Sequence, residues 1–474
     1  MRFAIPVSIA PLFLAGGALA QPADLAAVET TARSADAQFI AWQEHLIDDE
    51  ATGGVELRGS DGLAMGDLNG DGFEDIVSVH ESDDVYDGAP EGHIRIAYGT
   101  LDPHVWNLVT LAEGPEAGAA EDVAIGDMNG DGYLDIVAAC ELAHLIYFEN
   151  PGEGAPYDAP WERVIPAATT GRGSFIRVFL ADLNDDGTLE VVTANKGAQD
   201  PTQAAQEPRP ISFFEIDGAP LESSAWIEHV LTEVPWPINA QPIDLDSDGD
   251  MDVVGGSVAQ GRIGWFENRG GAGRFDFVEH AIEVVAADGG TAPMVNGFNM
   301  DFTDLNDDGR IDIVTFDTAR LIGLNAVWLE QPAAPGDAWR LHRIGGYAPD
   351  NIVGLVLADI NGNGRLDLMT GGYSLGSRTA DGGADPGGAL GRLAWFENPG
   401  NPTEVWPRHD FSRRQRGMFD KFVVRDLDFV GTRGNSGPYD GVFWLEQVRS
   451  VVPMPAFTRA RENDSPEIPL PSTR

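Results

Sequence analysis

The sequence predicts an all-β fold, a seven-bladed β-propeller of four-stranded antiparallel blades. An acidic, glycine-containing motif of the type DLNGDG-x-x-D recurs along the chain, and its first aspartate falls at 67, 127, 182, 244, 304, 359 and 426, a spacing of 55 to 67 residues. Runs of β-branched and aromatic residues, which are typical of strands, flank each motif. Four short strands in a repeat of this length are typical of a propeller blade, and a solenoid is the alternative.

The four strands of one repeat follow in a fixed order. The first enters the acidic motif, as in DVAIGD from residue 122, and the second leaves it, as in DIVAAC from 135. The third has the form of LIYFENPG at 145, and the fourth combines a tryptophan with a later histidine, as in AWIEHVLT at 225. The first strand of this fourth kind, at 41–48, precedes every motif, and none follows the seventh motif. We therefore expect the N-terminal strand to close the ring by completing the last blade, which removes an open sheet edge.

The two ends of the chain differ from the repeats. The first residues have the pattern of a cleaved signal peptide, with Arg2, an apolar stretch and Ala-Leu-Ala before Gln21. A membrane anchor is the alternative, but Pro6, Pro11 and the cleavage pattern argue against it. The protein is therefore expected to be secreted or periplasmic. The expected segments are a signal peptide at 1–20, a leader at 21–39, the propeller at 40–447 and a disordered, proline-rich tail at 448–474.

The composition restricts the possible partners. Acidic residues outnumber basic ones by 76 to 30, and the formal net charge is −46. Such a field repels nucleic acid and anionic membranes and attracts cations, so neither nucleic acid binding nor membrane insertion is expected. Cys140 is the single cysteine, which rules out an internal disulfide. We expect a monomer that binds carbohydrate or an extracellular protein.

The acidic motif has the ligand order of a loop that binds a hard cation. In DLNGDGFED, residues 67–75, side-chain oxygens fall at positions 1, 3, 5 and 9, and the backbone carbonyl at position 7 can supply a fifth. Gly72 at position 6 permits a sharp turn. Calcium accepts six to eight oxygens, and magnesium is the second choice because it demands a stricter octahedron. An EF-hand would carry a glutamate at position 12 and flanking helices, whereas strand-like residues follow here, so a strand–loop–strand site fits better.

Six copies keep these ligands in register, so about six structural Ca²⁺ sites are expected. The fourth loop carries a carboxylate at position 3, and the sixth, with an amide at position 5, should bind more weakly. The seventh copy has lost most ligands and should hold no metal. The expected ligands, with position 7 acting through its backbone carbonyl, are Asp67, Asn69, Asp71, Phe73 and Asp75; Asp127, Asn129, Asp131, Tyr133 and Asp135; Asp182, Asn184, Asp186, Thr188 and Glu190; Asp244, Asp246, Asp248, Asp250 and Asp252; Asp304, Asn306, Asp308, Arg310 and Asp312; and Asp359, Asn361, Asn363, Arg365 and Asp367.

These motifs resemble the FG-GAP and VCBS repeats of secreted bacterial proteins and of the integrin α-subunit propeller. The resemblance covers roughly residues 40–447 and rests on the DLNGDG-x-x-DIV pattern and on ends of the WFENPG type. It implies a seven-bladed calcium-binding propeller. It does not imply one function, because similar repeats occur in adhesion modules, glycan-binding domains, and some polysaccharide lyases and dehydratases.

The face opposite the metal loops is the expected ligand face. In an up-and-down blade the loops between strands two and three lie there, and variable loops on a rigid scaffold commonly bind ligands. A basic patch in so acidic a chain would select an anionic group such as an acidic polysaccharide, although pairing of these arginines with nearby carboxylates is the alternative. A protein-interaction scaffold and a polysaccharide lyase are the other functions considered, the latter with His80 and Tyr373 as proton-transfer candidates. The ligand-face candidates are His80, Arg172, Arg177, Lys196, Tyr373, Arg413, Arg414 and Arg416.

Overall fold

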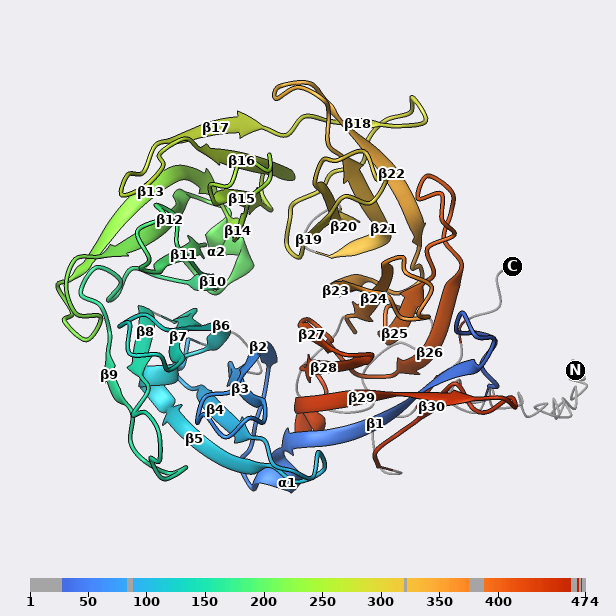
Figure 1. Cartoon of the computed structure of the whole chain (residues 1–474), viewed down its shortest axis with the longest axis horizontal. Coiled ribbons are helices and arrows are strands. Elements are labelled where there is room, and N and C mark those ends of the chain that lie inside the picture. Colours follow the sequence, from blue (N-terminus) through green and yellow to red (C-terminus); the bar gives the residue numbers. More distant parts are fainter. Residues whose placement is uncertain are drawn as a thin grey trace, which may run out of the picture.

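The computed structural model describes residues 28–82, 88–142, 144–318, 322–374, 388–461, 467–468 and 470. Within them, seven antiparallel blades stand around a ring (Figure 1), as predicted from the repeat. Two of the blades belong to one larger sheet because Gly323 pairs with Ile352 at a single position. The expected signal peptide lies outside the described residues.

Each blade begins with the strand that enters an acidic motif. Blade 1 contains β2 (Ser60–Gly66), β3 (Asp75–His80), β4 (His93–Tyr98) and β5 (Asn107–Glu113). Blade 2 contains β6 (Ala120–Gly126), β7 (Asp135–Cys140), β8 (His144–Glu149) and β9 (Glu162–Val164). Blade 3 contains β10 (Phe175–Ala181), β11 (Glu190–Asn195), β12 (Pro208–Ile216) and β13 (Trp226–Pro235). Blade 4 contains β14 (Pro237–Ile243), β15 (Asp252–Ser257), β16 (Arg262–Asn268) and β17 (Phe277–Ala281).

The remaining blades depart slightly from this plan. Blade 5 contains β19 (Asp301–Thr303), β20 (Asp312–Thr318), β21 (Gly323–Glu330) and β22 (Trp339–Gly346), and β18 (Val284–Ala286) adds a parallel edge strand to β22. Blade 6 contains β23 (Ile352–Ala358), β24 (Asp367–Gly372), β25 (Gly391–Phe396) and β26 (Arg408–Arg414). Blade 7 contains β27 (Phe422–Arg425), β28 (Asp428–Arg433), β29 (Gly441–Ser450) and β1 (Phe39–Asp49).

The N-terminal strand closes the ring, as predicted. β1 pairs antiparallel with β29, from Phe39 opposite Ser450 to Asp49 opposite Gly441. Trp42 on β1 is 2% exposed and packs its ring against Phe411 and Phe429. Strand pairing and a buried aromatic side chain therefore both hold the two ends of the propeller together.

Within the described residues, the C-terminal tail does not follow the expectation of disorder. β30 (Phe457–Thr458) pairs in parallel with β1 at Trp42 and Gln43, which makes the closing sheet mixed. Phe457 is buried, and farther along the tail Glu467 is buried beside Arg414. The expectation was wrong for these residues because a proline-rich composition does not reveal that a few apolar and charged side chains match a surface elsewhere.

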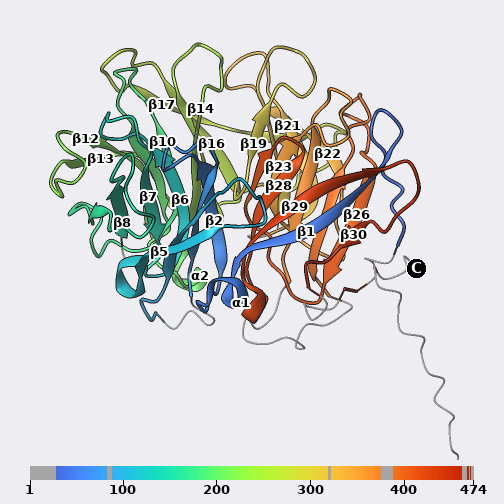
Figure 2. The ribbon, with the colours of Figure 1, turned by 60° about the horizontal axis from the view of Figure 1, so that its bottom comes forward.

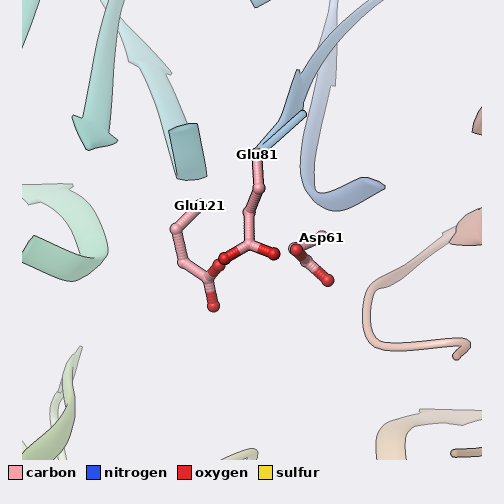
Figure 3. Close-up of side chains that lie close together, drawn as sticks. All are labelled: Asp61, Glu81 and Glu121. Atoms are coloured by element: carbon pink, nitrogen blue, oxygen red, sulfur yellow. The ribbon is translucent and has the colours of Figure 1, made fainter. Parts of the chain in front are cut away.

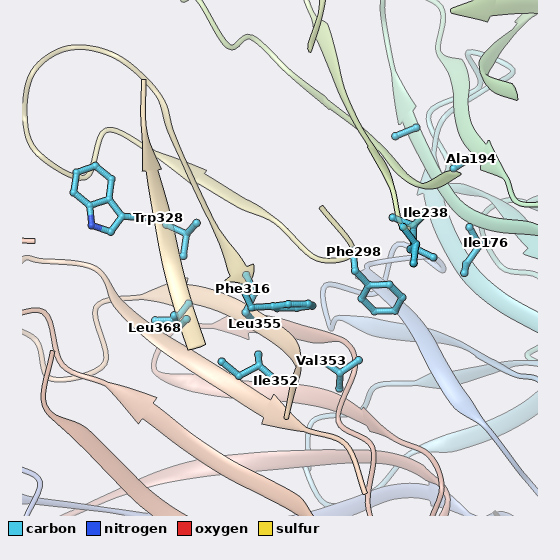
Figure 4. Close-up of a cluster of buried hydrophobic side chains, with 14 of the residues drawn as sticks. Ile176, Ala194, Ile238, Phe298, Phe316, Trp328, Ile352, Val353, Leu355 and Leu368 are labelled. Atoms are coloured by element: carbon cyan, nitrogen blue, oxygen red, sulfur yellow. The ribbon is translucent and has the colours of Figure 1, made fainter. Parts of the chain in front are cut away.

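Hydrophobic side chains from neighbouring blades form the core. The largest cluster runs from Ile176 and Ala194 through Phe298 and Phe316 to Leu368, so it spans blades 3 to 6 (Figure 4). The strands run through the thickness of the ring, and loops gather on its two faces (Figure 2). The short helices α1 (Glu50–Gly53) and α2 (Pro201–Ala204) both lie on the lower face in that view. They belong to a connection between blades and to a loop between strands two and three, so this is the face opposite the acidic loops.

Candidate metal loops and a buried acidic cavity

The six acidic loops share one backbone conformation. Position 6 is a glycine in each loop, with φ between 83° and 103°, as the sequence predicted. Position 4 also has positive φ, between 54° and 77°, even where it is Asp185, Ser247 or Asp307. Because non-glycine residues rarely adopt this region, the loop geometry must be strongly specified by its other contacts.

Hydrogen bonds from backbone N–H groups of the loop to its own side chains specify this conformation. The position 1 carboxylate accepts the N–H of position 6 at 2.7–3.1 Å in all six loops. The position 3 side chain accepts the N–H of position 5 at 2.8–3.3 Å. These bonds turn the oxygens of positions 1 and 3 toward the inside of the loop, where each oxygen keeps a lone pair for a cation.

The carboxylate at position 9 is the buried end of each loop. It accepts the N–H of position 2 at 2.8–3.1 Å, so it fixes the start of the loop to the second strand. Burial raises its pKa, because the charged form is poorly solvated there. The pKa rises to about 6 for Asp75 and Asp135 and to about 7 for Glu190, Asp252, Asp312 and Asp367. A bound cation would offset the unfavourable burial of these negative charges.

In the fourth loop the carboxylate oxygens already converge. One oxygen each from Asp244, Asp246 and Asp252 lies within 4.8 Å of the others, and such a group could hold a metal ion. The fit to calcium is good, because these ligands are hard oxygens with a backbone carbonyl nearby in the sequence. The seventh motif is reduced to the two-residue turn between Arg425 and Asp428, in agreement with its lost ligands.

A side-chain amide links each of four loops to the following blade, which the sequence analysis missed. Asn150, at the end of the third strand of blade 2, donates its Nδ2–H to the carbonyl of Leu68 in the loop of blade 1 at 2.8 Å. The equivalent bonds join Asn268 to Leu183, Gln331 to Leu245, and Gln447 to Ile360. The signal is present in the recurring FEN and LEQ ends of the third strands, but a linear pattern does not show that these amides reach the preceding blade.

Five histidines recur in the fourth strands, and each has structural contacts with the neighbouring third strand. Each packs against an aromatic ring of the neighbouring third strand: four pairs are stacked, such as His342 on Trp328 with 4.3 Å between ring centroids, and His280 is tilted against Trp265. Each also contacts, through Nε2, a glutamate on that strand or directly after it, as His342 contacts Glu330 at 2.8 Å. The other pairs are His45 with Glu446, His229 with Glu215, His280 with Glu267 and His409 with Glu397.

The expected basic ligand face is not formed. Arg413 and Arg414 are fully buried in the residues described, and they contact Asp350 at 2.8 Å and Glu44 at 2.7 Å. Arg416 is 1% exposed. The alternative interpretation, pairing with carboxylates, is therefore correct for Arg413 and Arg414. A buried guanidinium needs such partners, because an unpaired charge in the protein interior is strongly destabilising.

The other ligand-face candidates are also mostly enclosed. Arg177 pairs with Asp420 at 3.2 Å, and Lys196 pairs with Glu141. His80 is 0% exposed and lies between the hydroxyls of Ser60 and Ser78, and burial lowers its pKa well below the usual value. Arg172 stays 38% exposed at its side chain but pairs with Glu228. These residues therefore do not form one exposed basic surface.

Two of the ligand-face candidates instead line a small cavity with acidic walls. Lys196 and Tyr373 line this cavity of about 60 Å³, together with Asp61, Glu81 and Glu121. The last three are buried, and Figure 3 shows their carboxylates directed toward one another. Burial, and then the charges of Asp61 and Glu141, raise the pKa of Glu121 well above its usual value. These three carboxylates could hold a metal ion. The sequence contains no local motif for them, because the three residues come from two blades.

Comparisons with known proteins identify the repeat. A sequence profile described as an FG-GAP-like repeat matches residues 67–138, 127–193 and 244–315. No curated protein sequence matches the chain. Among the described residues, no helix has the length and apolar character needed to cross a bilayer.

Solved propellers resemble the chain at low sequence identity. Sqt1 from Chaetomium thermophilum, solved with the N-terminus of ribosomal protein L10, is 10% identical and aligns over 86% of this chain and 99% of its own, with a TM-score of 0.43. The Vibrio cholerae biofilm matrix protein Bap1 is 12% identical, with coverages of 87% and 91% and a TM-score of 0.39. The PQQ-bound aldose sugar dehydrogenase from Streptomyces coelicolor is 10% identical, with coverages of 69% and 94% and a TM-score of 0.36.

Proposed function

We propose that this chain, a β-propeller with FG-GAP-like repeats, is an exported, calcium-stabilised binding module for carbohydrate or an extracellular protein. The observation that carries the calcium assignment is the conformation shared by six loops, in which positive φ at positions 4 and 6 accompanies inward-turned oxygens. Asn/Asp/Gly turns that arose independently would not repeat that geometry six times.

Calcium would bind the oxygens at positions 1, 3, 5 and 9 and the carbonyl at position 7, and it would supply the counter-charge that these carboxylates lack. The loops lie where each blade's first hairpin turns, and amides such as Asn150 and Asn268 tie them to the next blade. Ordering of one loop therefore supports two blades. On this proposal the metals are structural, and the ligand binds elsewhere on the rigid ring.

The proposal excludes catalysis of the kind considered for a polysaccharide lyase. A lyase needs a base that reaches a proton of the substrate. His80, the best candidate from sequence, is buried between two serine hydroxyls and is held neutral, which does not suit that role. Incubation with acidic polysaccharides would test this: the release of products with unsaturated uronate ends would contradict the non-catalytic assignment.

The calcium assignment is tested by matched variants in the fourth loop. Asp248→Asn at position 5 keeps an oxygen that can accept the N–H of Asp250, but it removes a charge. Asp250→Asn removes the same charge two residues away, where only the backbone carbonyl is a ligand. Equilibrium dialysis against calcium should show weaker binding to one site for Asp248→Asn and nearly unchanged binding for Asp250→Asn. Equal effects of the two variants, or no calcium binding by the wild type, would contradict the proposal.

The binding role itself needs a separate measurement. The calcium-loaded protein is screened against arrays of glycans and of extracellular proteins, and the screen is repeated in chelator. Capture that is lost in chelator supports a binding module held in shape by calcium. If neither array is bound by the folded, calcium-loaded protein, the assignment as a binding module is wrong.

A further inference from the structure

The acidic cavity lies on the axis of the ring, away from the acidic loops. Its wall includes residues of the first strand, or just before that strand, from every blade, such as Asp61 of blade 1, Ile238 of blade 4 and Asp420 of blade 7. Glu81 and Tyr373 each lie directly after the second strand of their blade, so the cavity is toward the face opposite the acidic loops. None of the described residues that line it belongs to one of those loops.

Three carboxylates of this cavity are close enough to share one ion. One oxygen each from Asp61, Glu81 and Glu121 lies within 4.8 Å of the others. Oxygens that bind the same calcium ion are each about 2.3–2.6 Å from it, so they are at most about 5 Å apart. Asp61 and Glu81 are each 2% exposed and Glu121 is 7% exposed, so water solvates these charges poorly. Like charges in such a place repel each other unless a cation or a proton lies between them.

Glu121 lacks the close partners that a buried carboxylate normally has. Its carboxylate is directed into the group (Figure 3), and within the described residues it accepts no hydrogen bond. Its ion-pair contact with Nη1 of Arg177 is 3.7 Å long, and that guanidinium is closer to Asp420, at 3.2 Å. Lys196, the basic residue in the wall, pairs with Glu141. Because buried polar groups are almost always hydrogen-bonded, this carboxylate indicates a further positively charged ligand in the cavity.

A side chain on the other side of the cavity gives independent support. The indole Nε1 of Trp236, in the wall of the cavity, is buried and makes no hydrogen bond within the described residues. An N–H donor cannot bind a cation, but it can donate to a water molecule that does. The cavity of about 60 Å³ has room for an ion with a few waters, each of which needs about 10–15 Å³ of this volume. Organic ligands fill pockets of roughly 300 Å³ or more, so this size favours a hydrated metal ion.

We propose that Asp61, Glu81 and Glu121 bind one calcium ion on the axis of the propeller, and that water completes its coordination. Carboxylate oxygens select hard cations, and the described residues of the wall include no imidazole or thiolate that would favour zinc. Calcium is preferred to magnesium because it accepts an irregular set of ligands. The ion joins blade 1 to blade 2 on the face opposite the acidic loops, in addition to the six loop sites.

The test is the anomalous scattering of calcium, measured at long wavelength from crystals of the full chain grown in millimolar calcium. We expect a peak between the three carboxylates in the wild type and no peak there in Glu121→Gln, which keeps the shape of the side chain but removes its charge. The matched control is Glu162→Gln, which removes the same charge from an exposed position on β9 of blade 2 and should keep the peak. In equilibrium dialysis, Glu121→Gln should bind one calcium ion fewer per chain, or bind that ion at least tenfold more weakly.

The peaks in the acidic loops separate this inference from the proposed function. If the loops are occupied and the cavity is empty, the inference is wrong and protons neutralise the three carboxylates. A cavity peak of equal height in Glu121→Gln would also overturn it, because Glu121 would then not be a ligand. If the cavity is occupied and the loops are empty, the inference stands and the calcium assignment of the loops fails. If both are empty, both assignments are wrong.

Discussion

Replacing Asp350 by alanine should destabilise the propeller strongly, because this carboxylate neutralises two buried guanidinium groups. It accepts hydrogen bonds from Nε of Arg392 at 2.7 Å and Nε of Arg413 at 2.8 Å, and from the backbone N–H of Leu390 at 2.8 Å. Asp350 and both arginines are 0% exposed. The variant therefore leaves two charges without their main partner in an interior that water does not reach.

The magnitude follows from that burial. Removing one partner of a buried ion pair costs about 3–5 kcal/mol, and two arginines are affected here, so about 4 kcal/mol is a lower expectation. At about 2.1 cal/mol/K of unfolding entropy per residue, a chain of 474 residues has about 1 kcal/mol/K, so the midpoint should fall by about 4 °C or more.

The assay is thermal and urea unfolding of the calcium-loaded protein, with Glu207→Ala as the control. That glutamate pairs with Arg209 at 3.0 Å but is 73% exposed, so its removal should change stability by less than about 0.5 kcal/mol. If Asp350→Ala were as stable as the control, the arginines of this cluster would not depend on the carboxylate, and our reinterpretation of the predicted ligand face would be wrong.

Four further outcomes are expected. Millimolar calcium should raise the unfolding midpoint relative to chelator, since a ligand of the folded state stabilises it by mass action, and an unchanged midpoint would contradict the metal loops. Asn268→Ala should cost about 1–3 kcal/mol in urea unfolding, because the carbonyls of Leu183 and Met251 lose their donor, whereas Asn401→Ala, at an exposed turn, should cost little. Truncation after Ser450 should lower the thermal unfolding midpoint, because Arg414 loses Glu467 and the backbone N–H of Trp42 loses the carbonyl of Ala456. An unchanged midpoint would mean that the tail is not part of the closing sheet. Burial raises the pKa of Asp440 to about 7, so its stabilising contribution is full below about pH 4 and is lost as the pH rises through 7; the stability of the wild type relative to Asp440→Asn should therefore fall over that range, and a difference that does not change with pH would contradict this.

The sequence by itself determined the ring, its closure and the conformation of the acidic loops. The loop motif keeps its oxygen-bearing residues within nine positions, so their spacing alone places the oxygens on one turn. The glycine at position 6 indicates a positive φ, which the structure has in all six loops. The count of strands placed β1 in the last blade, because a propeller blade needs four strands and the seventh repeat supplied three. The order of residues within one loop and the period of the repeat can both be read directly from a sequence.

Only the tertiary structure decided which partners the charged residues have on the face opposite the acidic loops. Arg413 finds Asp350, 63 residues away, and Arg414 finds Glu44, 370 residues away, so no local spacing could indicate either pairing. The acidic cavity joins Asp61 and Glu81 of blade 1 to Glu121 of blade 2. A side chain's neighbours across blades depend on how the ring packs, and burial in turn decides whether an arginine pairs internally or meets a ligand.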